Sequence, residues 1–212
     1  MLKDWNFWFS VITAATAVVA LILTFLQIQI SNKQSLFDRR LAVFIKINGM
    51  VQLYTENTVL LRPSKDNDPI FSVDFVFVCL TNNSYLEEVG GVIQTPLENP
   101  LHKQFLKKLE DIKQLAVEAE LVFNRKNAAK VVCSFVTDYE RLLRSMYQYQ
   151  ILLNNMKKYS KDFRATLEDS QKGVREPEHR KNLLSAYEAI KNSYELIVQS
   201  NAIEQLKNQI KL

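Results

Sequence analysis

Glycine and proline are scarce in this chain of 212 residues, which has four glycines and five prolines. A β-sandwich or barrel needs a turn about every ten residues, and turns depend largely on these two residue types. The shortage therefore argues against both architectures. Because so few helix breakers are present, we expect an all-α fold built from long helices.

Cysteine and histidine are equally rare, with two of each. Cys79 and Cys133 cannot staple a chain of this length, so we interpret them as free thiols in a reducing compartment. His102 and His179 each stand alone, without metal-ligand spacing, and the chain has no glycine-rich phosphate loop and no nucleophile elbow. We predict no catalytic residue, no metal site and no cofactor. An enzyme whose site is assembled from distant residues remains the alternative.

The chain does have one long apolar run, WFSVITAATAVVALILTFL, from Trp8 to Leu26. It carries no charge, and as a helix it spans about 28 Å, the thickness of a bilayer's hydrocarbon core. A cleaved signal peptide has a shorter apolar region and a basic start. A core helix of a soluble protein seldom lacks every charge over this length. We therefore predict a transmembrane anchor at residues 1–30, embedded in the lipid bilayer.

Four basic residues follow the apolar run within twenty positions: Lys33, Arg39, Arg40 and Lys46. Before the run there is only Lys3, beside Asp4. The positive-inside rule then places the N-terminus outside and the rest of the chain in the cytoplasm. We interpret the four residues as a basic cluster at the membrane surface. Nucleic-acid binding is not favoured, because no basic and aromatic repeat accompanies the cluster and the net charge is only +4.

Small residues recur on one face of the apolar run: Ser10, Thr13, Ala17, Ala20 and Thr24. Their spacing matches the 3.5-residue period of a left-handed helix pair. In lipid, small side chains let two backbones approach closely, and hydroxyl groups can hydrogen-bond across the contact. This small-residue stripe is therefore a candidate transmembrane packing face. Composition is the competing explanation, since eight of the run's 19 residues are serine, threonine or alanine.

The anchor helix is expected to continue to about Leu61, because no proline comes before Pro63. Residues 31–61 then form a juxtamembrane amphipathic helix. Its predicted apolar face, which needs a protein partner, consists of Phe37, Leu41, Phe44, Ile47, Val51 and Tyr54.

Residues 62–212 are predicted to form a cytoplasmic helical bundle. After a turn at 62–69, the run at 70–80 alternates like a strand, whereas the spacing of Phe71, Phe75 and Val78 suits a buried helix. A strand would need a partner, and the only other β-like run is at 131–136. Helix is favoured, because the rest of the chain is predicted to be helical. We predict that a capping box at Ser84–Glu87 begins a short helix, and that Asn99–Pro100 begins a longer one.

Apolar residues then recur every three and four positions over three stretches. The first runs from Phe105 to Phe123, up to a polar junction at 124–127, and the last begins at Leu183, after the breakers at 173–177. The middle stretch consists of Phe135, Tyr139, Leu142, Met146, Tyr149, Leu153 and Met156, with Phe163 and Leu167 in the same phase. Three long helices joined by short loops are expected to pack antiparallel, with seams like those of a coiled coil.

The sequence SNKQSLFDRR at 31–40, directly after a span that ends in QIQI, resembles that of uncharacterised bacterial single-span membrane proteins. In that group an S-x-K-x-x-L-F-x-x-R segment leads into a helical cytoplasmic domain, and some members sit near phage-defence or prophage genes. The resemblance covers roughly the first fifty residues. It implies the bacterial inner membrane and a connection with phage defence, and it assigns no binding or catalytic residue.

Together these features favour a membrane-anchored helical scaffold, not an enzyme, that self-associates or docks a cytoplasmic protein partner. A membrane effector or toxin that perturbs the bilayer on oligomerisation is the alternative. Gln27, Gln29 and Ser31 could line the mouth of a pore, but the span itself has no charged face for a lumen.

Overall fold

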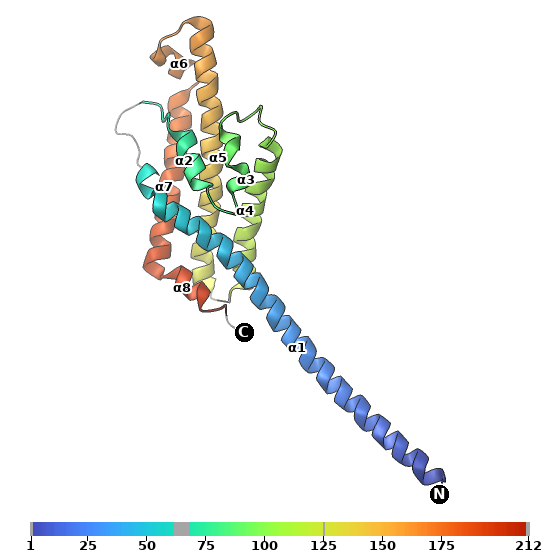
Figure 1. Ribbon diagram of the computed structural model, residues 1–212. Helices are drawn as coiled ribbons and strands as arrows, with labels where there is room; N and C mark the ends of the chain where they lie inside the picture. Colours follow the sequence, from blue (N-terminus) through green and yellow to red (C-terminus); the bar gives the residue numbers. More distant parts are fainter. Residues whose placement is uncertain (1, 62–67, 125, 211–212) are drawn as a thin grey trace.

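The computed structural model describes residues 2–61, 68–124 and 126–210, and every regular element in these ranges is helical. The predicted all-α class is therefore confirmed. Figure 1 shows a bundle of helices from which one long helix, α1 (Leu2–Asn57), projects with the N-terminus at its far end. A short 3-10 helix, η1 (Thr58–Leu61), follows α1 directly.

Helix α1 is unbroken over 56 residues because it contains no proline and a single glycine, Gly49. The described side chains up to residue 36 are all exposed. From Val43 onward the helix packs on the bundle and buries Val43, Ile47, Met50 and Tyr54. The predicted segment boundaries at residues 30 and 61 remain predictions. Buried residues of the predicted segments 31–61 and 62–212 belong to one hydrophobic core.

The buried face of α1 differs from the predicted one. Leu41 was assigned to that face, yet it is exposed, whereas Val43 and Met50 were left out and are buried. The true face is rotated by nearly one residue around the helix, and its buried apolar residues begin at Val43. Ile47 and Tyr54 are common to both faces.

Three long helices form the bundle: α4 (His102–Val122), α5 (Lys126–Phe163) and α7 (Glu176–Ser200). Helix α5 lies between the other two and runs antiparallel to both (Figure 1). The short helices α6 (Leu167–Gly173) and α8 (Ala202–Lys207) precede and follow α7. The polar junction therefore separates the long helices α4 and α5 as expected, whereas the glycine–proline junction separates the short helix α6 from α7.

The predicted seam of α5 is confirmed, since all seven residues from Phe135 to Met156 are buried. Its predicted extension to Leu167 is wrong. Helix α5 ends at Phe163, Arg164 has a positive φ of 47°, and Leu167 opens α6 with half of its surface exposed. The Thr166 side chain caps α6 by accepting a hydrogen bond from the N–H of Asp169, at 3.2 Å. The side chain of Phe163 lies outside the described part of the chain.

The run at 70–80 is helical, as favoured, and forms α2 (Val73–Leu80). The face that α2 buries is the opposite of the predicted one. Phe71, Phe75 and Val78 are exposed, while the buried residues are Val73, Val76, Phe77 and Leu80. A short helix can bury either apolar face, and packing against α1 and α5 selects the second. The predicted turn before it falls mostly outside the described ranges.

Two helix starts also differ from prediction, because asparagine side chains hold the preceding turns. Asn83 Oδ1 accepts hydrogen bonds from the N–H groups of Tyr85 and Leu86, so Ser84 is not a cap and α3 (Glu87–Gly90) begins later. The 3-10 helix η2 (Gly91–Ile93) follows it. Asn99 Oδ1 likewise accepts from the N–H of Leu101, and α4 begins only at His102.

Candidate functional site

Within the described residues, one helix is long and apolar enough to cross a membrane, and it is α1. No other described part of the chain covers its apolar stretch. The side chains of Phe9, Leu21 and Phe25 are 60%, 71% and 61% exposed. An apolar surface of this extent marks contact with a membrane or with another protein.

The small-residue stripe lies on this uncovered part of α1, and all five of its residues are exposed. The hydroxyl of Thr13 donates to the carbonyl of Phe9, and that of Thr24 donates to the carbonyl of Ala20, each at 2.8 Å. These two hydroxyl protons are therefore used within α1 itself. What the two threonines offer to a second helix is mainly small volume, which permits close packing.

Two apolar residues nearer the bundle continue the stripe. Leu41 is 36% exposed and Ile45 is 59% exposed, on the side of α1 opposite Val43 and Ile47. Leu41 follows Ala20 by three heptads, and Ile45 follows Thr24 by the same distance. We call the stripe together with Leu41 and Ile45 the uncovered face of α1. The sequence places Leu41 with Phe37 and Phe44 on an apolar face that needs a protein partner, and Ile45 is not part of that predicted face.

Three of the four predicted basic residues contact the bundle. Arg39 Nε lies 3.4 Å from Glu118 Oε1, and Lys46 Nζ lies 5.2 Å from the centre of the Tyr85 ring. Arg40 binds backbone carbonyls, as described next. Lys33 is exposed between the apolar stretch and the bundle.

Arg40 holds α1 against the ends of two other helices. Its Nε donates a hydrogen bond to the carbonyl of Val122, the last residue of α4, and its Nη1 donates to the carbonyl of Gln209, just after α8. Carbonyls at a helix C-terminus lack partners in their own helix and carry partial negative charge, which a guanidinium complements. Arg40 thus fixes the junction between α1 and the bundle, a role that its position in the sequence does not reveal.

The most buried charged group is Glu176, which is fully buried at the start of α7. Its Oε1 accepts a hydrogen bond from the hydroxyl of Tyr149 and lies 3.6 Å from Arg180 Nε. Burial and the adjacent Glu176 raise the pKa of Tyr149, and that hydroxyl also accepts from the N–H of Ile70. The arrangement ties α5, α7 and the segment before α2 together.

Few groups in the described residues could support a reaction. Among the described residues, no group of three or more His, Cys, Asp or Glu side chains could hold a metal ion. Burial raises the pKa of the Cys133 thiol, which is the opposite of what activates a cysteine nucleophile.

No family model, no curated protein and no solved structure matches this chain. The likeness to bacterial single-span proteins therefore remains a prediction from residues 31–40. The arguments for function come from α1, its uncovered face and its junction with the bundle.

Proposed function

We propose that this protein is a membrane-anchored scaffold that self-associates through α1 and presents its helical bundle to the cytoplasm. The observation that carries the proposal is the uncovered face of α1. One unbroken helix bears small residues where it is most apolar and exposed Leu41 and Ile45 beside the bundle, all in one heptad phase. The bundle packs on the opposite side and leaves this face exposed.

Two copies of α1 could pack along this whole face. An α-helix drifts by about 20° per heptad from a 3.5-residue repeat, and a left-handed supercoil removes the drift. The small residues would then meet in lipid, and Leu41 and Ile45 would be buried in the aqueous part. Gln27, Ser31 and Gln34 lie on the same line, where their polar groups can pair at the membrane surface.

Asp38 also lies on this line, so pairing would bring two carboxylates together. Like charges on facing helices oppose association and set which partners are tolerated. The proposal therefore expects Asp38→Asn to strengthen self-association in membranes, whereas Asp74→Asn, on α2, should leave it unchanged. Weaker association of Asp38→Asn would contradict the proposed face.

The proposed location is the bacterial inner membrane, with the N-terminus outside. It is supported by the basic residues that follow the apolar run and by the resemblance at 31–40. The same resemblance supports a role in phage defence. Docking of a cytoplasmic protein on the bundle fits the same scaffold.

Disulfide crosslinking in membranes tests the proposal on the full chain. Cys79 and Cys133 are first replaced by serine, and single cysteines are placed at positions 10, 13, 17, 20, 41 and 45, with positions 11, 15 and 18 as controls. We expect high yields at the first six positions and low yields at the controls. A flat profile, or one that peaks at the controls, would show that the periodicity of the stripe is accidental.

A membrane effector is the second candidate, supported by the same uncovered apolar helix and by Gln27, Gln29 and Ser31 at its cytoplasmic side. Induced expression in cells loaded with a membrane-potential dye separates the two functions. Rapid depolarisation would favour the effector, and an unchanged potential would favour the scaffold.

A further inference from the structure

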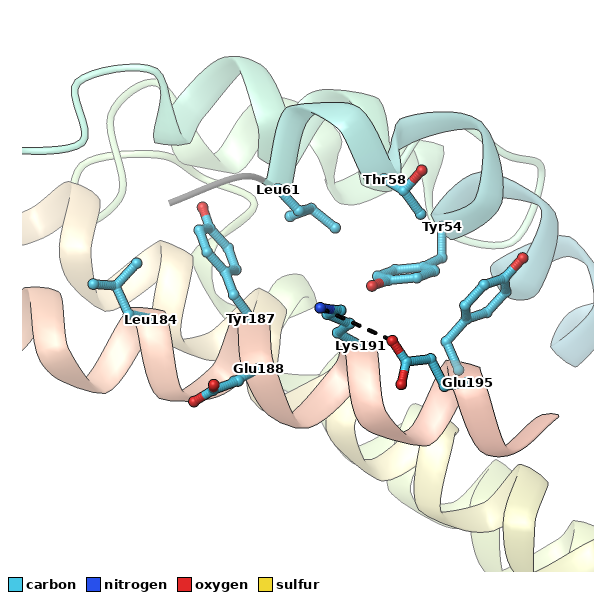
Figure 2. Close-up of a pocket in the computed structure, with 9 residues that line it drawn as sticks. Tyr54, Thr58, Leu61, Leu184, Tyr187, Glu188, Lys191 and Glu195 are labelled. Carbon is cyan, nitrogen blue, oxygen red and sulfur yellow. Dashed lines mark ion pairs between the residues drawn. The ribbon is translucent and has the colours of Figure 1, made fainter. Parts of the chain in front are cut away.

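A pocket of about 570 Å³ lies between the end of α1 and α7 (Figure 2). Tyr54 of α1 and Thr58 and Leu61 of η1 line one side, and Leu184 and Tyr187 of α7 line the other. Sites for small molecules have volumes of roughly 300–1,000 Å³ and mainly apolar and aromatic walls with a few polar groups. The size and the walls of this pocket both fit that description.

Aromatic contacts fix one end of the pocket. The ring centres of Tyr54 and Tyr194 are 4.9 Å apart, and the hydroxyl of Thr55 donates a hydrogen bond to the hydroxyl of Tyr194 at 3.0 Å. These contacts hold α1 against α7 and fix the orientation of the Tyr54 ring in the wall of the pocket (Figure 2).

Tyr187 brings an unused hydrogen-bonding group to the pocket. Its side chain rises from α7 toward Leu61 (Figure 2), its residue surface is 6% exposed, and its buried hydroxyl has no hydrogen-bond partner in the described chain. Burying a hydroxyl without a partner costs free energy, which an acceptor on a ligand would recover. Burial also raises the pKa of Tyr187, so this hydroxyl keeps its proton at neutral pH and can donate a hydrogen bond.

The pocket lining carries one ammonium group, on Lys191, and two carboxylates, on Glu188 and Glu195. Lys191 rises between the rings of Tyr187 and Tyr54, and its Nζ pairs with Glu195 Oε1 at 3.9 Å (Figure 2). Glu188 points away from the centre. A cationic ligand would meet the Lys191 ammonium and an anionic one would meet the Glu195 carboxylate, so neither charge is accommodated without disturbing the pair.

We propose that this pocket binds an uncharged, planar aromatic molecule that accepts a hydrogen bond from Tyr187. The tyrosine rings and the leucines contact the ring system of the ligand, while Tyr187 selects molecules that carry an acceptor such as an amide carbonyl. The ligand contacts both α1 and α7, and therefore stabilises the docking of the anchor helix on the bundle. This inference does not depend on whether α1 self-associates.

Three analogues that share one ring system test the proposal: indole-3-carboxamide, indole-3-carboxylate and indole-3-methylammonium. Binding is measured by saturation-transfer NMR on the full chain in lipid nanodiscs, with empty nanodiscs correcting for partition into lipid. We expect the neutral carboxamide to bind at least tenfold more tightly than either charged analogue. Equal binding of the three, or no binding of the carboxamide, would overturn the proposal.

The variant Tyr187→Phe removes only the hydroxyl and keeps the ring. We expect it to weaken carboxamide binding about tenfold and to leave the melting temperature of the free protein unchanged or higher, because the unpaired hydroxyl is gone. Tyr85→Phe, remote from the pocket, is the matched control and should change neither quantity. Undiminished carboxamide binding by a folded Tyr187→Phe variant would show that the hydroxyl is not part of a site.

Discussion

Arg40 Nε donates a hydrogen bond to the carbonyl oxygen of Val122 over 2.7 Å, and this contact joins the long helix α1 to the end of α4. The same guanidinium reaches the carbonyl of Gln209 at 3.1 Å, so that three segments far apart in the sequence meet at one side chain. Apolar contacts begin only at Val43. The direction in which α1 leaves the bundle therefore depends strongly on Arg40.

Replacing Arg40 with methionine should reduce the free energy of unfolding by about 1.5–3 kcal/mol, because hydrogen bonds from a charged group are lost and two carbonyls lose their partner. Denaturant unfolding of a fragment that begins at Ser31, and so keeps the buried face of α1, measures this loss. Arg39→Met is the matched control. Its ion pair with Glu118 is largely exposed and should contribute less than about 1 kcal/mol. Equal losses in the two variants would contradict the role assigned to Arg40.

Arg40 also shows what sequence reasoning can miss. Its charge is evident from the sequence and predicts a membrane-surface cluster with Lys33, Arg39 and Lys46. Which carbonyls it reaches depends on where α4 and α8 end in space, and no local pattern encodes that. Charge counting shows which end of a span is basic, but not what each basic residue contacts in the fold.

The seam of α5 predicts a large effect at Leu142, which is fully buried in the middle of the helix. Leu142→Ala should cost about 2–5 kcal/mol of stability, through lost burial and the cavity that is left. Lys157→Ala, on the exposed side of the same helix, should cost less than about 0.5 kcal/mol. Denaturant unfolding of the same fragment gives both values, and similar small losses would mean that the heptad phase is misassigned.

Buried tyrosines make the protein sensitive to high pH. Burial raises the pKa of Tyr54 to about 12, and it also raises those of Tyr139 and Tyr187. An unfolded tyrosine loses its proton near pH 10, whereas the folded ones keep theirs. Stability should therefore be fully present below pH 10 and fall as the pH rises to 12 and beyond, by up to about 1.4 kcal/mol per pH unit for each such tyrosine. Unfolding curves at pH 9, 10 and 11 measure the fall, and a flat profile would contradict the burial.

Topology can be tested with fusions to a reporter that is active only in the cytoplasm. A fusion after Leu212 should be active and a fusion before Met1 inactive, because positive residues follow the span. Replacing Arg39, Arg40 and Lys46 with glutamine should weaken this bias and give a mixed population. The opposite pattern of reporter activity would reject the proposed orientation.

Periodicity predicted the long helices well and the short ones poorly. The α5 seam from Phe135 to Met156 repeats often enough to define one buried face, and all of it is buried. In α2, eight residues offer two apolar faces, and only packing against α1 and α5 decides that Phe75 is exposed and Phe77 buried. The pocket around Tyr187 could not be predicted from the sequence for the same reason. Its walls come from α1 and α7, which lie near opposite ends of the chain.

The last prediction concerns the small-residue stripe, and it separates packing in lipid from packing between bundles. Ala17→Leu or Ala20→Leu adds bulk on the uncovered face and should block close approach of two helices, so association of the isolated segment 1–34 in membranes should fall. Ala15→Leu adds the same bulk on another face, where it meets lipid, and should be tolerated.

The isolated segment is the right object because Leu41 and Ile45 could hold full-length copies together after the span is disrupted. Resonance energy transfer between labelled segments in vesicles measures association. If Ala15→Leu is as harmful as Ala17→Leu, the stripe is not a packing face, and any self-association must come from the cytoplasmic helices.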